Sequence, residues 1–296
     1  MADTVELHAL TDTLTIAPGV EMHRLGLGTY KAEDGPDVAR EVSEGLAMGY
    51  RLIDTASLYG NEATIGEVIR ESGIPRDDIF LTTKLWNSDQ GYQPTLAAFD
   101  LSLQRLGVDQ LDLYLIHWPW SQHVRETWRA MEELLASGRT RAIGVCNYLP
   151  HHLHELASFA NVLPAVNQFE FHPRLQQPEL QATCCEYGIT MQAWAPLMRG
   201  KVADIPLLVA IAEKYGKTPA QVSIRWILEL GITTIPKSIH PERIAENCDV
   251  YDFSLTEEEI EAINGLDSGH RIGPNPETYT TLGSNPGAGA VAHKAR

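Results

Sequence analysis

The stretch LIDTASLYGNE, residues 52–62, decides how this sequence is interpreted. Its first residues, Leu52 and Ile53, form an apolar run typical of a buried strand, and the run ends on the ionisable Asp54. Burying a carboxylate is costly unless a partner stabilises it. Tyr59 follows almost at once, in a segment that carries a Gly-Asn pair. Asp54 therefore needs a partner from elsewhere in the chain, and Tyr59 lies beside it.

Similar apolar runs recur along the chain and alternate with longer amphipathic stretches. The runs predict strands near residues 24–29, 51–56, 79–85, 111–117, 140–147, 164–171, 189–196 and 232–238. The stretches between them often end at Gly, as helices do, for example DVAREVSEGLAMG. Strands that alternate with helices predict right-handed crossovers and a parallel sheet covered on both faces. We expect an α/β fold, a (β/α)8 TIM barrel, with an open doubly wound sheet as the alternative.

We expect a single domain that spans residues 1–296. Ahead of the barrel, residues from about 4 to 23 predict a β-hairpin with a Pro-Gly turn, which would cap the bottom of the barrel. The barrel is expected over about residues 24–265. The remaining segment, about 266–296, contains GSNPGAGAVAHKAR, which has little to pack, so it predicts a loop or tail.

The composition excludes several classes of protein. Lys and Arg total 23 against 39 Asp and Glu, and the net charge of −16 argues against a nucleic-acid surface or an anionic membrane as partner. No run reaches the roughly 18 apolar residues that a membrane span needs. The N-terminus, MADTVELHAL, predicts neither a signal nor a transit peptide. The cysteines lack CxxC spacing, which indicates reduced thiols, so we expect a cytoplasmic protein.

Ionisable side chains close three neighbouring strands of the expected barrel. Asp54 ends the second strand, Lys84 the third and His117 the fourth, and Tyr59 follows the second. Each alone is explained by a structural role, but barrel chemistry is assembled at the carboxyl ends of several strands. An ammonium group near Tyr59 would lower the pKa of its hydroxyl, and Asp54 would hold Lys84 charged. Such a hydroxyl suits protonation of a carbonyl oxygen during hydride transfer, with His117 as a donor to the substrate.

Seven motifs together resemble the aldo-keto reductase superfamily: LGLGTY, LIDTASLYGNE, TTKLWN, LYLIHWPW, GVCNY, VNQFEFHP and IPKSIHPERIAEN. They follow in order between about residues 20 and 275. Within the superfamily the chain is most similar to the bacterial 2,5-diketo-gluconate reductase and prostaglandin F synthase-like branch. The resemblance implies a barrel that uses NADPH to reduce aldehydes, ketones or keto-sugars. It also implies that Tyr59 is the general acid, that Lys84 and Asp54 tune it, and that His117 orients the carbonyl.

The segment PKSIHPER, after the last expected strand, predicts an anion site. Lys237, Ser238 and Arg243 place two cations and a hydroxyl near the start of a helix, where this class of barrel binds phosphate. A solvated helix start is the alternative. The resemblance implies that these residues hold the 2′-phosphate of NADP, and that Glu246 and Asn247 lie near the adenine.

The resemblance also implies the rest of the cofactor site. Asn147 and Gln168 resemble the residues that bind the nicotinamide carboxamide, and Trp194 would stack against the ring, although an aromatic residue there could equally be core. Cys146 departs from the family, where many members have Ser, and a thiol is the weaker donor. The remaining residues expected to contact the cofactor are Gly28, Thr29, Tyr30, Asp54, Ala195 and Leu197.

Aromatic residues are expected to line the substrate pocket. Tyr30, Trp86 and Trp118 follow strands one, three and four, and with Tyr59 and His117 they suit compact carbonyl compounds. The resemblance implies that the tail after Gly269 folds over this pocket. His151 and His154 stand one helical turn apart without acidic partners, so we expect no metal site.

The sequence leaves two other functions open. One is a nonenzymatic regulatory subunit that keeps the barrel and binds NADPH. The other is a barrel hydrolase or lyase that forms a Schiff base on Lys84, but this leaves Trp194 and the PKSIHPER segment unexplained. We expect a monomer whose partner is a small-molecule carbonyl substrate.

Overall fold

The computed structural model describes residues 6–119 and 121–279. Eight parallel strands form its central sheet, in which each strand pairs with the next along the chain. The strands are β3 (Leu27–Gly28), β4 (Leu52–Asp54), β5 (Phe80–Leu85), β6 (Leu111–Ile116), β7 (Thr140–Cys146), β8 (Val166–Glu170), β9 (Thr190–Trp194) and β10 (Thr233–Thr234). All eight expected strands are therefore present.

The first and last strands meet and close the sheet into a barrel. The backbone N–H of Gly26 donates to the Thr234 carbonyl at 2.9 Å, and that of Gly28 donates to the Pro236 carbonyl at 3.1 Å. Gly28 is required at this seam, because a Cβ atom there would lie 2.7 Å from the Ile235 carbonyl oxygen. The predicted (β/α)8 barrel is confirmed, and the open sheet is excluded.

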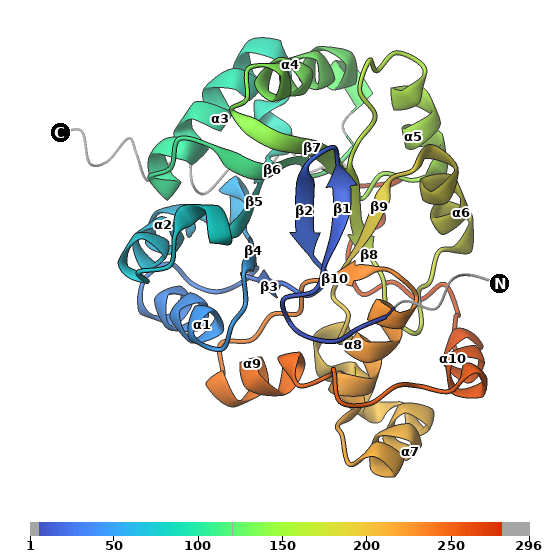
Figure 1. The fold of residues 1–296 in the computed structure, drawn as a ribbon. Coiled ribbons are helices and arrows are strands. Elements are labelled where there is room, and N and C mark those ends of the chain that lie inside the picture. The colour runs from blue at the N-terminus through green and yellow to red at the C-terminus, as the bar shows by residue number, and fades with distance from the viewer. Residues whose placement is uncertain (1–5, 120, 280–296) are drawn as a thin grey trace.

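Helices surround the barrel, and α1 to α6 follow one another around it in chain order, whereas α10 lies beside α7 (Figure 1). They are α1 (Pro36–Ala47), α2 (Glu62–Glu71), α3 (Tyr92–Leu106), α4 (Val124–Ala136), α5 (Pro150–Ala157), α6 (Pro178–Tyr187), α7 (Pro206–Tyr215), α8 (Pro219–Glu229), α9 (Pro241–Cys248) and α10 (Glu257–Asn264). Many begin with Pro at the first helical positions, where its missing N–H costs nothing. Within the described residues, no helix has the length and apolar character needed to span a membrane.

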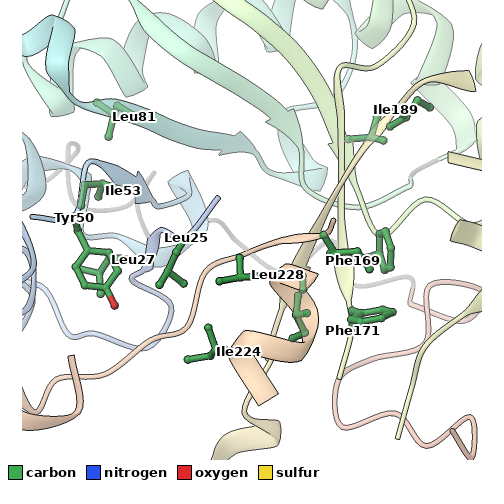
Figure 2. Close-up of a cluster of buried hydrophobic side chains, with 14 of the residues drawn as sticks. Leu25, Leu27, Tyr50, Ile53, Leu81, Phe169, Phe171, Ile189, Ile224 and Leu228 are labelled. Carbon is green, nitrogen blue, oxygen red and sulfur yellow. The ribbon is translucent and has the colours of Figure 1, made fainter. Parts of the chain in front are cut away.

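Successive side chains along each strand point to opposite faces of the sheet, and this alternation divides the core into two clusters. On β4, Leu52 packs inside the barrel, whereas Ile53 faces the surrounding helices. On β5, Phe80 and Leu81 divide in the same way. The larger, outer cluster fills the layer between strands and helices. Figure 2 draws part of it, including Ile53 and Leu81 from the strands and Ile224 and Leu228 from α8. This layer fixes the strands against the helices and leaves the inner face free for other side chains.

A two-stranded hairpin covers the amino-terminal end of the barrel (Figure 1). Strands β1 (Thr13–Ala17) and β2 (Val20–His23) pair antiparallel, and Met22 packs with the inner barrel cluster. The hairpin cap was therefore predicted, but it is shorter than expected. The segment TVELHAL forms no strand over its described residues 6–10.

Candidate active site

The inner face of the barrel becomes polar at the carboxyl ends of its strands. Alternate side chains along a strand face the same side. Asp54 therefore faces the inside of the barrel with Leu52 on β4, and Lys84 does so with Phe80 on β5. Parallel neighbours bring such positions together at one end of the barrel. The same alternation that buries apolar side chains inside the barrel therefore also directs Asp54 and Lys84 toward each other at the carboxyl ends of the strands.

Lys84 is the partner that Asp54 requires. Its ammonium nitrogen lies 2.5 Å from Asp54 Oδ1 and donates to the Thr55 carbonyl at 2.8 Å. The Lys84 side chain has no exposed surface, and that of Asp54 has 2%. The Tyr59 hydroxyl lies 3.5 Å from Lys84 Nζ. The three groups thus form the arrangement expected from the sequence.

The expected shift in the Tyr59 pKa is wrong in sign. Burial raises the pKa of the Tyr59 hydroxyl, and the opposing effect of Lys84 does not offset it. Burial also lowers the pKa of Lys84, but Asp54, Tyr59 and Cys146 together raise it above its ordinary value. Lys84 is therefore charged and Tyr59 protonated at neutral pH, so the hydroxyl has a proton to donate.

His117 follows β6 and packs its ring against Tyr59. The two ring centroids are 5.6 Å apart in an edge-on arrangement, and Trp86 also packs edge-on against the His117 ring at 5.3 Å. Burial and then the charge of Lys84 hold the pKa of His117 well below its ordinary value. His117 is therefore a neutral imidazole at neutral pH, able to donate one ring N–H.

Gln168, on β8, hydrogen-bonds to the second oxygen of Asp54. Its amide nitrogen donates to Asp54 Oδ2 at 2.7 Å and to Gln192 Oε1 at 2.8 Å. The Cys146 thiol lies 3.9 Å from Gln168 Oε1, and burial raises the pKa of that thiol, so it stays protonated. Gln168 therefore connects Asp54 to Cys146 and Gln192.

Asn147 and Trp194 hydrogen-bond to each other beside this network. Asn147 has a φ of 63°, a conformation that Asn tolerates better than most residues. Its amide nitrogen donates to the His117 carbonyl at 2.9 Å, and its Oδ1 accepts from the indole N–H of Trp194 at 2.8 Å. Both side chains are thus held in fixed orientations at the edge of the cavity described next.

A single cavity of about 720 Å³ extends from Tyr59 and His117 to the start of α9. Most of the predicted site residues line it: Gly28, Tyr30, Asp54, Tyr59, His117, Trp118, Asn147, Gln168, Trp194, Ala195, Leu197, Lys237, Ser238, Arg243, Glu246 and Asn247. Its size and continuity suit a long ligand with a smaller one at its inner end.

Four predicted residues lie behind the cavity wall instead of lining it. Lys84 and Cys146 are buried beneath Tyr59 and Gln168. The prediction that Trp86 lines the substrate pocket is wrong, because its ring is 1% exposed and packs against His117. Thr29 does not line the cavity either, since its hydroxyl donates to the Asp54 carbonyl at 3.0 Å. These residues support the lining side chains from behind.

The far end of the cavity carries positive charge. Lys237 and Arg243 line it, and within the described residues neither is engaged in an ion pair with a carboxylate. The Ser238 hydroxyl accepts from the His240 N–H at 3.1 Å, which shapes the turn into α9. In a chain of net charge −16, two cations at one cavity end and a helix N-terminus fit an anionic group.

Two further segments line the cavity, and the sequence failed to indicate the first of them. The first is the short 3-10 helix Met198–Asp204, in which Arg199 and Gly200 take positive φ values of 56° and 89°. The other is the C-terminal segment, from which Gly273, Pro274 and Tyr279 reach the cavity. The predicted loop over the mouth is thus present as far as Tyr279, and residues 280–296 lie outside the described residues.

Comparison with known proteins identifies the family. The model of the aldo/keto reductase family matches residues 24–268. The chain belongs to this family. It is 50% identical to the glyoxal reductase of Bacillus subtilis over 91% of this chain and 98% of that protein.

Solved structures agree. A Bombyx mori aldo-keto reductase in complex with NADP has a TM-score of 0.85 and 33% identity, over 92% of this chain and 97% of that one. A structure provisionally assigned as 2,5-diketo-D-gluconic acid reductase B has a TM-score of 0.84 and 35% identity, over 91% and 95%. The resemblance seen in the motifs is confirmed, and family membership supports carbonyl reduction as the general activity.

Within residues 6–119 and 121–279, no group of three or more His, Cys, Asp or Glu side chains could hold a metal ion. His154 instead hydrogen-bonds to the Tyr187 hydroxyl at 2.8 Å, and His151 lies 3.3 Å from Glu277. The two histidines noted in the sequence therefore have separate partners.

Proposed function

We propose that this protein is an NADPH-dependent reductase of small aldehydes, ketones or keto-sugars. The observation that carries the proposal is the contact between Tyr59 and Lys84 at the inner end of the cavity, 3.5 Å between hydroxyl and ammonium. A relative described as a glyoxal reductase supports this substrate class. A similar structure solved in complex with NADP supports the cofactor. We also propose that the chain acts as a monomer in the cytoplasm.

Tyr59 is the proton donor in this proposal. Tyr59 lines the cavity, and its hydroxyl is protonated at neutral pH because burial raises its pKa. As a carbonyl oxygen gains negative charge, the Lys84 ammonium stabilises the phenolate that remains after the proton leaves. Asp54 keeps Lys84 charged and fixed, because its Oδ1 lies 2.5 Å from the ammonium.

His117 orients the substrate. As a neutral imidazole it donates one N–H to the carbonyl oxygen without competing with Tyr59 as an acid. Trp86 and Tyr59 pack edge-on against its ring and restrict its rotation. Tyr30 and Trp118 line the same end of the cavity and bury the apolar part of a small substrate.

The residues present fit NADPH. Lys237, Ser238 and Arg243 would hold its 2′-phosphate, with Glu246 and Asn247 near the adenine. Asn147, Gln168 and Trp194 would hold the nicotinamide end. When bound, NADPH supplies the hydride that reduces the carbonyl carbon.

The decisive experiment follows NADPH oxidation at 340 nm with a panel of aldehydes and ketones, for the wild type and Tyr59→Phe. We expect turnover by the wild type and a loss of at least about 100-fold in Tyr59→Phe, the range of a general acid. NADPH affinity, measured by fluorescence, should change by less than about threefold. Full turnover by Tyr59→Phe would contradict the assignment.

The same assay, together with a borohydride trap, separates the other functions. A regulatory subunit would bind NADPH without oxidising it for any carbonyl of the panel. A Schiff-base enzyme would be trapped by borohydride on Lys84. Against that chemistry, the Lys84 amine is fully buried and bonded to Asp54 and to the Thr55 carbonyl, so it has no access to a substrate.

A further inference from the structure

Glu41 is a buried carboxyl group in the middle of α1 that the mechanism does not use. Glu41 has no exposed surface. Oε1 accepts a hydrogen bond from the backbone N–H of Ser238 at 3.2 Å. Oε2 is also buried and has no hydrogen-bond partner within the described residues. A buried polar atom without a partner is costly, so the position of this carboxyl calls for an explanation.

The location of Glu41 suggests one. Ser238 and its neighbour Lys237 line the positively charged end of the cavity. Glu41 contacts that segment from the opposite side, through the Ser238 amide. The segment Lys237–Ser238 thus has the cavity on one side and the Glu41 carboxyl group on the other.

Lys237 is the charged side chain that acts on Glu41. On α1 itself, Asp37 pairs with Arg40 at 3.0 Å, and Glu44 is one turn away. The elements packed against α1 carry further charged residues: Glu62, Glu67, Arg70 and Glu71 on α2, and Glu242, Arg243 and Glu246 on α9, with His240 before it.

We propose that Glu41 is a positioning residue that sets the preference for NADPH over NADH, because its carboxyl group and the 2′-phosphate compete for Lys237 and the Ser238 segment. This inference rests on the proposed placement of the phosphate at Lys237, Ser238 and Arg243. A protonated Glu41 leaves the full charge of Lys237 to the phosphate. An ionised Glu41 places a negative charge behind the same lysine and repels the phosphate.

The protonation state of Glu41 changes within an accessible pH range. Burial raises its pKa to about 8, although Lys237 and the Ser238 N–H oppose the shift. The carboxyl group is thus mostly neutral at pH 7, and the affinity for NADPH is at its highest there. As pH rises through 8, Glu41 ionises and NADPH affinity falls. NADH has no 2′-phosphate, so its affinity should not follow this change.

The first test measures the dissociation constants of NADPH and NADH, by quenching of tryptophan fluorescence, at about pH 7 and 9.5. We expect the NADPH constant of the wild type to rise about tenfold, which corresponds to a coupling of one pKa unit, and the NADH constant to stay within about twofold. Glu41→Gln should bind NADPH equally at both pH values. Glu67→Gln, an exposed position on α2, is the matched control and should behave as the wild type.

Two results would overturn the proposal. One is an equal pH dependence of NADPH binding in the wild type and Glu41→Gln. The other is NADPH binding by the wild type that does not weaken at high pH.

A second measurement needs no Glu41 variant. The phosphate should favour protonated Glu41, so NADPH binding at about pH 8.5 should take up about half a proton, for a coupling of one pKa unit. Calorimetry in buffers of different ionisation enthalpy measures this uptake, and NADH should show none. Equal uptake with both nucleotides would count against Glu41.

Lys237→Ala separates this inference from the proposed function. If the variant loses NADPH and NADH affinity equally, the phosphate lies elsewhere and the proposal for Glu41 fails with its premise. If it loses NADPH affinity alone while the wild type takes up no proton, only the Glu41 inference fails.

Discussion

The side-chain amide of Gln168 donates to Asp54 Oδ2 at 2.7 Å, on the opposite oxygen from the Lys84 ammonium at 2.5 Å. Gln168 was expected to bind the cofactor, and it does line the cavity. Its contact with Asp54 gives it a second role, because both oxygens of a nearly unexposed carboxylate then have a donor. Burial raises the pKa of Asp54 above its ordinary value, and Lys84 and the Gln168 amide both oppose that rise.

Removing this donor should destabilise the fold. In Gln168→Leu, Asp54 Oδ2 loses a charge-assisted hydrogen bond, and we expect the free energy of unfolding to fall by about 1.5–3 kcal/mol. Urea denaturation measures the change. Gln192→Leu is the matched control, because Gln192 accepts from the same amide without touching Asp54, and about 1 kcal/mol is expected there. Equal losses in the two variants would mean that the Asp54 contact contributes nothing beyond a neutral bond.

His117 should stay neutral throughout the physiological range. Burial and Lys84 hold its pKa well below 6.5, so its two ring nitrogens should show the shifts of a neutral imidazole from about pH 5.5 to 8. Two-dimensional 15N NMR measures this, with the signal assigned by its loss in His117→Asn. Because the folded pKa is below the unfolded one, stability should rise with pH in the window below 6.5. A His117 signal that titrates near 6.5 would disprove the neutral-donor role.

Much of this site was predictable from the alternation of side chains along each strand and from the positions of the strand ends. Asp54, Lys84 and Gln168 share the inward-facing period of their strands, so locating the strands was enough to bring them together. Trp86 also follows its strand, but it packs beneath His117. The sequence does not specify whether a large aromatic ring lines a cavity or supports the residue that does.

The features that were missed depend on tertiary packing. Arg199 and Gly200 reach the cavity through positive φ values in a loop, and no strand end indicates that conformation. Glu41 lies in an amphipathic helix, where a charged residue normally faces solvent. Its burial arises from the contact of α1 with the segment before α9, which are far apart in the chain.

Lys237 should distinguish the two nucleotides. Loss of a charge-assisted bond to the 2′-phosphate, worth about 1.5–3 kcal/mol, corresponds to roughly a 10–100-fold weaker NADPH affinity in Lys237→Ala. NADH affinity should change by less than about twofold. Fluorescence titration gives both constants, and Lys201→Ala, at an exposed position, serves as the control for loss of a positive charge.

Cys146 should tolerate replacement by Ser. The thiol lies 3.9 Å from Gln168 Oε1 and is nearly unexposed, so a hydroxyl group fits the same space and is the stronger donor. We expect Cys146→Ser to keep its activity and to bind NADPH at least as tightly, within about twofold. A clear rise in the NADPH dissociation constant would show that the thiol has a role that a hydroxyl cannot replace.

Glu170 should hold the C-terminal segment over the cavity. Its Oε1 accepts from the Ile272 N–H at 2.6 Å, and its Oε2 accepts from the Gly273 N–H at 3.2 Å. Gly273 packs so closely on Trp194 that a Cβ atom would lie 2.3 Å from the indole ring. The Glu170 carboxylate therefore fixes where the segment crosses a residue that we expect at the nicotinamide.

In Glu170→Gln these two amides lose a charged acceptor, and we expect their hydrogen exchange to accelerate at least about tenfold, the equivalent of 1.4 kcal/mol. The KM for the carbonyl substrate should rise with it, because the segment covers the substrate end of the cavity, while the NADPH dissociation constant should change less. Glu179→Gln, an exposed position on α6, provides the charge-matched control. Unchanged exchange at Ile272 and Gly273 in Glu170→Gln would show that the ring contact between Trp118 and Tyr279, 4.3 Å between centroids, holds the segment without the carboxylate.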